Sequence, residues 1–475
     1  MSAVAVSWLA IAAYCVAMLA IGAWAARRTH DADDFFLGGR RLGPWIAALS
    51  QGATQSSAWT MVGVSGAAFA WGLPAVWIWL SVVAGYAVNW FWVAPRLRRL
   101  SAEEGSLTLV QLLAGPAADA RARRLRRSAS AVVVFSFLFY VAAQFQAAGQ
   151  AFAIALDLPL AACILAGGAV IVAYTLAGGF WAASVTDFVQ ALLMLLVAVA
   201  LPAAALQAVG GAGALLAGLE AAPVPHDLLG GRAAAAAAAF VLGTLGIGLA
   251  APGQPHVANH FMAARDDRAI RQGGFIALAW IALVLGGMLV VGWSAHLVAV
   301  APGRAEDALF VAAAAWLPPV LAALVTVAVL SAIMSTVDSQ LITATSSITL
   351  DWSGGGAPSR ARAALLVFAA VAVAIAVFAP ATIYSRVLFA WNALGAAFGP
   401  LVVLTVLGRR PGPVAALAGL WTGFVLTVVF YLAPDAEGDV LERTVPFAVA
   451  LAVAGVIDAR SRSSPPASSA SSAAR

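Results

Sequence analysis

The sequence contains no lysine, only two cysteines and few charged side chains for its length. All 26 basic residues are arginines, and charged residues of both signs make up 10% of the 475 positions, whereas soluble globular proteins carry about 25%. Hydrophobic residues make up 63%. This composition excludes a soluble globular domain and indicates a polytopic membrane protein. Cys15 and Cys163 lie inside apolar runs, so we expect them to pack as small hydrophobic residues.

Apolar runs of about 20 residues recur along the whole chain, and this is the length that an α-helix needs to cross a bilayer. The runs are continuous and do not alternate with polar residues, which favours helices over a membrane barrel. The first run lacks a basic start, so we expect a membrane span there and no cleavable signal peptide. We predict an all-α membrane protein with about thirteen transmembrane helices, at 5–26, 42–71, 73–95, 128–155, 158–178, 182–207, 232–252, 273–300, 317–349, 362–379, 381–406, 412–433 and 444–459.

The arginines are distributed unequally between the two sides that these spans define. With the N-terminus outside, all but four of them fall on the cytoplasmic side. Arg232, Arg304 and Arg443 lie outside, and Arg386 lies near the outer end of a span. This distribution follows the positive-inside rule and predicts an outer N-terminus and a cytoplasmic C-terminus. The basic loops could also indicate nucleic-acid binding, but contact with anionic lipid is the simpler interpretation.

The middle of the chain divides into two halves of five spans each, 42–207 and 232–406, and each half opens with an interrupted span. Matched interruptions in two halves are a sequence feature of transporter binding sites. Because five is odd, the second half enters the membrane from the opposite side, so we predict a 5+5 inverted repeat with broken helices. We expect the remaining segments to be a first helix and cytoplasmic loop at 1–41, an extracellular loop at 208–231, two C-terminal helices at 407–459, and a disordered cytoplasmic tail rich in serine, alanine and proline at 460–475.

The first interruption is the segment SQGATQSSAW, Ser50 to Trp59, which places six uncharged polar side chains and Gly52 inside an expected membrane helix. Backbone unwinds at membrane depth only where it lines a cavity within the protein. Unwinding frees carbonyl and amide groups that side chains or a ligand then satisfy. The alternative is that these polar residues only join helices. Their density, together with the second interruption around GTLGIGLAAPGQP, favours a binding site.

A candidate cation site lies in the ninth predicted span. Ser335 and Thr336 follow Ala332 by three and four residues, so all three can share one helix face. Two hydroxyls, one carbonyl there and two carbonyls freed at 50–59 would supply five neutral oxygens, a suitable set for a hard monovalent cation. The alternative is that both hydroxyls bond back to the preceding turn of their own helix.

Two acids and two histidines lie near these segments. We predict that Asp187 and Asp338 are buried, and a carboxylate within a membrane is costly and normally functional. The alternative is an interfacial acid that pairs with a cytoplasmic arginine. His256 and His260 follow the second interruption in what we expect to be a loop. No third ligand is evident, so we predict no metal site apart from the cation site.

The chain resembles the sodium:solute symporter family, and in particular its bacterial sodium/proline branch. Five stretches carry the resemblance: FFLGGRRLG at 35–43, SQGATQSSAW at 50–59, YTLAGGFWAASVTDFVQ at 174–190, PGQPHVANHFMAA at 252–264 and SAIMSTVDSQL at 331–341. They cover nearly the whole chain in the order that the family has them. The resemblance implies the LeuT-like fold of broken helices and an inverted repeat.

The resemblance also implies roles for individual residues. The family's sodium ligands correspond to the carbonyls of Ala53, Ser56 and Ala332 and to the hydroxyls of Ser335 and Thr336. Asp187 matches an acid that the family associates with passage of the ion to the cytoplasm. From their positions in the sequence, we also assign Gln55 and Asp338 to the ion pathway. The positions expected to line the solute pocket are Ser57, Trp59, Tyr140, Ile247 and Ala251.

Two departures from the sodium/proline branch affect these expectations. That branch carries an aspartate at position 55, and Gln55 keeps an oxygen but loses the charge, which leaves a proton open as the coupling ion. The branch also places aromatic residues at the positions of Ile247 and Ala251, so a larger or differently shaped solute than proline is plausible.

We therefore predict a secondary active transporter that takes up a small organic solute, such as proline or another amino acid or carboxylate, together with Na⁺. The alternatives are a proton-coupled symporter or facilitator of the same fold, and a transporter-like sensor. No output domain is evident after the last span, which argues against the sensor. No acid/base or nucleophile pair is evident, so we predict no enzymatic activity. We expect the protein in the bacterial inner membrane, in contact with lipid and solute, without nucleic acid or an obligate protein partner.

Overall fold

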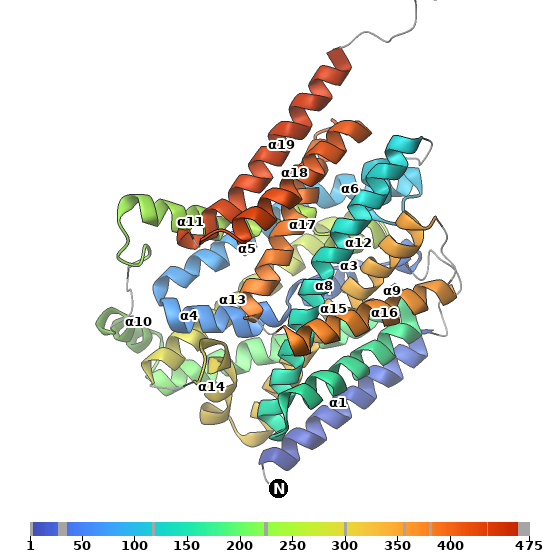
Figure 1. Ribbon diagram of the computed structural model, residues 1–475. Helices are drawn as coiled ribbons and strands as arrows, with labels where there is room; N and C mark the ends of the chain where they lie inside the picture. Colours follow the sequence, from blue (N-terminus) through green and yellow to red (C-terminus); the bar gives the residue numbers. More distant parts are fainter. Residues whose placement is uncertain are drawn as a thin grey trace, which may run out of the picture.

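The computed structural model describes residues 3–26, 36–115, 119–222, 227–298, 302–354, 358–379, 382–434 and 436–463. Within these ranges the protein is built from helices and contains no strand, with one isolated β-bridge between Leu42 and Ala264 (Figure 1). The predicted all-α membrane architecture is confirmed. Part of the predicted tail, 464–475, and the arginine pair at 27–28 lie outside the described residues.

The helices follow the predicted order of segments. Before the first half lie α1 (Ala3–Ala26) and η1 (Gly38–Arg40). The first half contains α3 (Pro44–Gln55), η2 (Trp59–Gly63), α4 (Val64–Trp71), η3 (Leu73–Ala75), α5 (Val76–Val88), η4 (Asn89–Val93), α6 (Ala94–Glu104), α7 (Leu109–Ala114), α8 (Ala120–Leu156) and α9 (Leu160–Val209). A short helix, α10 (Ala212–Ala221), connects the halves.

The second half and the C-terminal helices continue in the same way. The second half contains α11 (Ala234–Leu249), η5 (Ala251–Gly253), α12 (Pro255–Ala263), α13 (Asp267–Leu297), η6 (Ala305–Asp307), α14 (Ala308–Trp316), α15 (Pro319–Ser346), η7 (Ser347–Trp352), α16 (Pro358–Phe378) and α17 (Ile383–Val406). The chain then forms α18 (Pro413–Tyr431), η8 (Glu437–Asp439) and α19 (Val440–Ser463), which lie together at one edge of the molecule (Figure 1).

Eleven helices of the described residues are long and apolar enough to cross a membrane. They correspond to eleven of the predicted spans. The two remaining predicted spans fall on the interrupted pair α3 and α4 and on an apolar stretch, Leu160–Ala173, that is shorter than the others. The count of thirteen therefore stays a prediction.

A glycine separates two predicted spans inside the continuous helix α9. Gly179 has φ 62° and ψ −166°, a backbone conformation that residues with a Cβ rarely adopt. The kink divides α9 between the predicted spans 158–178 and 182–207. Asp187 lies two turns beyond the kink and is fully buried.

The centre of the bundle is formed by α15 and α17. Their apolar segments are 78% and 89% buried inside the protein, whereas the corresponding values for α1, α18 and α19 are 17%, 33% and 28%. A helix without a separate polar face toward the outside can be this buried only when other helices surround it. The peripheral helices therefore face the surrounding medium, and α15 is available to carry polar groups toward the interior.

Candidate functional site

The first interruption is a break between α3 and η2, in the middle of the interrupted helix. α3 ends at Gln55, and Ser56 leaves the helical region with φ −92° and ψ 73°. The Ser56 N–H still donates to the carbonyls of Gly52 and Ala53 at 3.0 Å. The chain then resumes as a wider π-helical turn, η2. The predicted break in this half is confirmed.

Side chains satisfy the backbone groups that the first break frees. The Ala58 N–H donates to Gln144 Oε1 of α8 at 3.0 Å, and the Trp59 N–H donates to the Ser57 hydroxyl at 3.2 Å. Buried backbone groups need such partners, because an unpaired one costs free energy comparable to a lost hydrogen bond. Gln144 was not identified from the sequence, since nothing in the local pattern of α8 relates it to a break far away in the chain.

The second interruption has a similar construction. α11 ends at Leu249, η5 follows, and Gln254 is extended with φ −89° and ψ 108° before α12 begins. Gln254 Nε2 donates to the carbonyls of Ala250 and Trp391 at 3.1 and 2.8 Å. The Trp391 indole N–H donates to the Ile247 carbonyl at 2.8 Å. One residue of α17 therefore binds both sides of the second break, and the sequence pattern did not reveal it.

The two broken helices meet at one end. The Leu42 N–H donates to the Ala263 carbonyl, and the Arg265 N–H donates to the Leu42 carbonyl, each at 3.1 Å. These bonds join the start of α3 to the end of α12, so the two interrupted helices are held together on the side that we predict to be cytoplasmic. Arg40 contributes to the same junction by donating to the Met262 carbonyl at 3.1 Å.

The hydroxyls of α15 contact the carbonyls at the end of α3. The Ser335 hydroxyl lies 3.0 Å from the Ala53 carbonyl and 3.1 Å from the Ala332 carbonyl. The Thr336 hydroxyl lies 2.8 Å from the Thr54 carbonyl and 2.9 Å from the Ala332 carbonyl. The Ser335 hydroxyl also lies 2.9 Å from the Ser331 carbonyl. The hydroxyls therefore bond both to their own helix and to the break, so the back-bonding alternative describes only part of their contacts.

Four of the five predicted sodium ligands thus come together within hydrogen-bond distance of one another, and all are neutral oxygens in a buried position. A cation there would turn the hydroxyl protons away, after which the carbonyl and hydroxyl oxygens could all face it. The fifth predicted ligand, the Ser56 carbonyl, has no contact with α15 among the described hydrogen bonds. The Thr54 carbonyl, which was not predicted, instead accepts a hydrogen bond from the Thr336 hydroxyl.

A second polar cluster adjoins these oxygens. Asp187 Oδ2 accepts hydrogen bonds from the hydroxyls of Ser50 and Thr54 at 2.9 and 3.2 Å. The Ser50 hydroxyl also lies 3.0 Å from His260 Nε2, and the Thr54 hydroxyl lies 3.0 Å from that of Ser339. All five residues are buried. Thr54 therefore connects the candidate sodium oxygens, through its carbonyl, with the Asp187 cluster, through its hydroxyl.

Asp338 lies on α15, one turn beyond Ser335, and is fully buried. For Asp187, the alternative of an interfacial acid paired with an arginine does not hold, because the acid is buried and its hydrogen-bond partners among the described residues are the hydroxyls of Ser50 and Thr54.

The prediction that His256 and His260 lie in a loop after the second interruption is wrong. His256 and His260 lie on the helix α12, because Pro255 can start a helix at its first turn, where its missing N–H has no cost. His260 Nδ1 lies 3.0 Å from the His256 carbonyl, as helical neighbours one turn apart do. Among the described residues no group of three or more His, Cys, Asp or Glu side chains is arranged to hold a metal ion.

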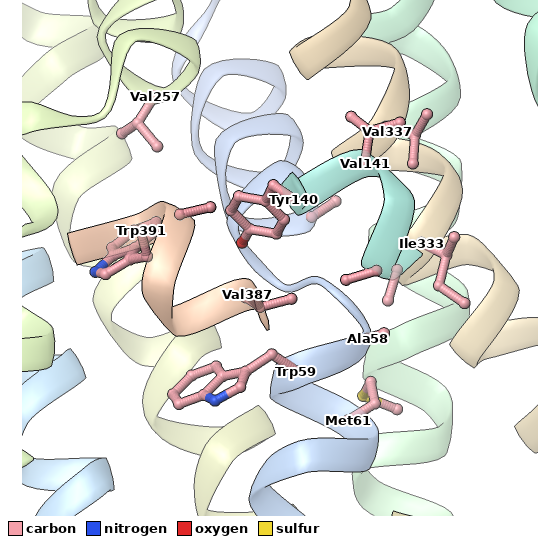
Figure 2. Close-up of a cluster of buried hydrophobic side chains, with 14 of the residues drawn as sticks. Ala58, Trp59, Met61, Tyr140, Val141, Val257, Ile333, Val337, Val387 and Trp391 are labelled. Carbon is pink, nitrogen blue, oxygen red and sulfur yellow. The ribbon is translucent and has the colours of Figure 1, made fainter. Parts of the chain in front are cut away.

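A small cavity lies directly beside the first break. Its volume is about 30 Å³, which is space for one or two waters. Of the predicted residues, Gln55, Trp59, Tyr140 and Ile247 line it. Figure 2 shows Trp59, Tyr140 and Trp391 on the same side of the unwound segment, next to Val387. The other lining residues were not predicted from the sequence: Thr60, Val82, Tyr86, Ile281, Val387, Leu388 and Trp391.

Two predicted pocket residues are placed differently. Ser57 does not line the cavity, and its hydroxyl accepts from the Tyr140 hydroxyl at 3.5 Å. Ala251 is buried in η5 and does not line the cavity.

Gln55 accepts a hydrogen bond from Gln51 within α3, and Gln51 in turn accepts from the Trp90 indole at 3.2 Å. This chain of amides fixes the Gln55 side chain at the cavity.

A row of aromatic rings extends from Trp59, which lines the cavity, to α4 and α11. The Trp59 and Tyr384 rings lie 6.0 Å apart, Tyr384 and Trp71 lie 5.7 Å apart, and Trp71 and Phe240 lie 5.9 Å apart. The Tyr384 N–H donates to the Glu306 carboxylate at 3.1 Å. Glu306 lies outside the candidate spans, and burial raises the pKa of its carboxyl above its usual range.

Two broken helices, unwound backbone facing a closed cavity and a cluster of neutral oxygens between α3 and α15 define a secondary active transporter of the inverted-repeat class. Comparison with known proteins agrees. The profile described as "Sodium:solute symporter family" matches residues 35–423. This chain belongs to the sodium:solute symporter family, whose members couple solute uptake to Na⁺, and it is a transporter, not an enzyme.

Individual relatives cover nearly the full length. The chain is 30% identical to the osmoregulated proline transporter OpuE of Bacillus subtilis, over 94% of this chain and 93% of the relative. It is 33% identical to a sodium/proline symporter of Escherichia coli, over 88% and 86%. A solved structure of a Na⁺-coupled sialic acid symporter superposes with a TM-score of 0.77 at 17% identity and covers 95% of this chain and 98% of that one. The nucleobase-cation symporter Mhp1 superposes with a TM-score of 0.54. These similarities confirm the LeuT-like fold.

Proposed function

We propose that this protein carries proline, or another small amino acid or carboxylate, inward across the bacterial inner membrane together with Na⁺. The N-terminus would lie outside and the C-terminus in the cytoplasm, as the arginine distribution indicates. The two repeats would be 42–207 and 232–406. The observation that carries the proposal is the contact of the Ser335 and Thr336 hydroxyls with the Ala53 and Thr54 carbonyls.

The proposed ion ligands are Ala53, Ser56, Ala332, Ser335 and Thr336, with the Thr54 carbonyl as a further candidate. An ion among these oxygens is bound by α3 and α15 at once. Its binding therefore favours one relative position of the two helices and orders the adjoining segment, which carries Trp59. The ordered segment then binds the solute more tightly. By linkage, the solute raises the affinity for the ion by the same factor.

The residues that line the cavity are suited to a small solute with an apolar body, and the cavity would have to widen to admit one. Trp59, Tyr140 and Trp391 supply aromatic surface, and Ile247 supplies aliphatic surface. The aromatic residues that the sodium/proline branch has at the positions of Ile247 and Ala251 are missing here, but Trp391 is bonded to the Ile247 carbonyl and presents a ring at the same wall. This replacement from α17 favours a ring-sized solute such as proline.

Gln55, Asp187 and Asp338 are proposed to lie on the route by which the ion leaves toward the cytoplasm. Thr54 connects the ion ligands with Asp187, because its carbonyl accepts from Thr336 and its hydroxyl donates to Asp187.

The membrane potential would drive the uptake. One positive charge that crosses about 100 mV contributes roughly 2.3 kcal/mol, or about fiftyfold accumulation of solute, before any sodium gradient is added.

Uptake by the purified protein in proteoliposomes tests the proposal. Labelled proline, other small amino acids and short carboxylates would be offered under an imposed sodium gradient, a proton gradient or neither. Uptake of proline that requires sodium is the expected result. Uptake driven by protons alone, or indifferent to both gradients, would refute sodium coupling in this chain, and uptake of a different solute under a sodium gradient would refute only the choice of proline.

A further inference from the structure

One face of α8 changes from basic to apolar along its length. Arg123, Arg124 and Arg127 lie near the start of the helix, and Ala131, Val134, Phe135 and Leu138 follow at spacings of three and four residues. Residues at such spacings form one continuous stripe on a helix. The stripe is not covered by a neighbouring helix along its whole length, because Phe135 is 39% exposed and all three arginines are exposed.

The stripe is the floor of two adjoining grooves. The basic groove has a volume of about 410 Å³ and contains the three arginines together with Trp352 and Trp421. The apolar groove has a volume of about 450 Å³ and contains Val134, Phe135, Leu138 and Ile348. Ala131 and Trp352 line both grooves, so the two are continuous. We call the combined feature the α8 groove.

The basic end of the α8 groove is built for an anion at a membrane interface. Among the described residues Arg123, Arg124 and Arg127 form no ion pair, whereas most other arginine clusters have one, such as Arg98 and Arg99 with Asp267. The nearest acid in sequence, Asp119, instead accepts from the Ala122 N–H at the helix start. Guanidinium groups bind phosphate oxygens with two parallel hydrogen bonds.

The tryptophans place this end at the membrane surface. Trp352, at the end of η7, and Trp421, on α18, are 51% and 40% exposed. Indole rings are enriched where the headgroups meet the hydrocarbon. The arginines then lie at headgroup level, and the apolar part of the groove lies where an acyl chain would run. The spacing matches a single amphiphile with an anionic head and a hydrocarbon tail.

We propose that the α8 groove is a specific binding site for an anionic phospholipid. Its phosphate binds Arg123, Arg124 and Arg127, and one acyl chain packs along Val134, Phe135 and Leu138. A free phosphate would leave the apolar groove unused, so a lipid is the occupant. This inference does not depend on which solute or ion is transported.

The position of the α8 groove connects the lipid with transport. The groove lies between α8, which carries Tyr140 and Gln144 toward the cavity, and η7, the continuation of the helix that carries Ser335. The Ser130 hydroxyl donates to the Ser347 carbonyl at 2.8 Å and fastens these two elements together beside the groove. A bound lipid would brace the same junction from the membrane side.

Native mass spectrometry of the full-length protein in detergent tests the site. The probes are phosphatidylglycerol, phosphatidylethanolamine and phosphatidylcholine, each titrated separately. The variants are R123Q/R124Q/R127Q, which removes the head contacts, and A131W, which fills the groove where its two parts join and leaves the charge unchanged. R265Q/R268Q/R271Q removes the same charge from the start of α13 and the residues just before it, on the same predicted side, and is the matched control. Thermal unfolding of each variant in detergent verifies that it is folded.

We expect preferential binding of one phosphatidylglycerol, weakened about tenfold or more by the loss of three arginines near the headgroup. A131W should weaken it as well, the control triple should not, and an excess of inorganic phosphate should not displace the lipid. Equal weakening in both arginine triples would overturn the proposal, because it would indicate attraction to the general surface charge. Unchanged binding in a folded A131W variant, or equal binding of all three lipids, would also overturn it.

Discussion

The Ser335 hydroxyl donates a hydrogen bond to the Ala53 carbonyl at 3.0 Å and so joins α15 to the end of α3, 282 residues away along the chain. Thr336 repeats this contact with the Thr54 carbonyl. An ion that replaces these bonds is held by both helices at once. Its binding free energy is therefore available to set their relative position, which is what coupled transport requires.

Loss of either hydroxyl should weaken sodium activation. For Ser335→Ala and Thr336→Ala we expect the sodium concentration for half-maximal uptake to rise about tenfold or more, since a ligand to a charge is worth about 1.5–3 kcal/mol. Ser346→Ala and Thr427→Ala are matched controls, because both are buried hydroxyls that bond only to their own helix. Sodium-dependent uptake at unchanged half-saturation in both site variants would contradict the proposed ligands.

An acid at position 55 should strengthen sodium binding. Gln55 lines the cavity beside the break and is neutral. In Gln55→Asp a carboxylate near the ion attracts it, and we expect the half-saturating sodium concentration to fall about tenfold, given the size of charge interactions at an effective dielectric constant near 20. Gln55→Asn controls for the change in length. The same sodium dependence in both variants would show that position 55 does not sense the ion.

The charge of Asp187 should matter for release of the ion. Asp187→Asn keeps an oxygen that can accept from Ser50 and Thr54. We expect net uptake to fall about tenfold or more, since a buried charge on an ion route is functional, while solute exchange across the membrane is less affected. Asp351→Asn is the control, because Asp351 is a buried acid bonded to Thr108, away from the site. Normal net uptake by Asp187→Asn would remove this residue from the pathway.

The indole N–H of Trp391 should support solute affinity. Trp391→Phe keeps the ring and removes the bond to the Ile247 carbonyl. We expect the KM for the solute to rise about tenfold, because a buried carbonyl loses its partner at a cost of about 1–3 kcal/mol, with sodium activation little changed. Trp280→Phe is the control, since the buried Trp280 indole has no hydrogen-bond partner among the described residues. Equal effects of the two substitutions would assign the loss to packing alone.

A methyl group at Gly253 should destabilise the second break. A Cβ there would lie 2.6 Å from the Gly399 nitrogen and 2.8 Å from the Gly395 Cα, both on the neighbouring helix α17. Backbone atoms cannot move aside as a flexible side chain does, so we expect Gly253→Ala to lower the free energy of unfolding by about 1–3 kcal/mol. Gly213→Ala, where a Cβ meets nothing within 4 Å, should not. Thermal unfolding in detergent compares the two, and equal midpoints would refute the close approach.

Local patterns were sufficient for the framework of the molecule. Apolar length predicts the helices, and clustered Gly, Pro and polar residues predict both breaks, because unwound backbone needs small residues and hydrogen-bonding side chains near it. Ser335, Thr336 and Ala332 could be grouped from their spacing on one helix face. His256 and His260 were misplaced in a loop, because Pro255 was taken to end the interrupted segment although it begins α12.

Contacts between distant segments were beyond the reach of the sequence. Gln144 satisfies the Ala58 N–H, Trp391 bonds to both sides of the second break, and His260 joins the Asp187 cluster, yet none of these residues has a local pattern that names its partner. Hydrophobic period and composition determine which segments enter the membrane. Which side chain reaches which freed backbone group depends on helix packing, and only the tertiary structure decided it.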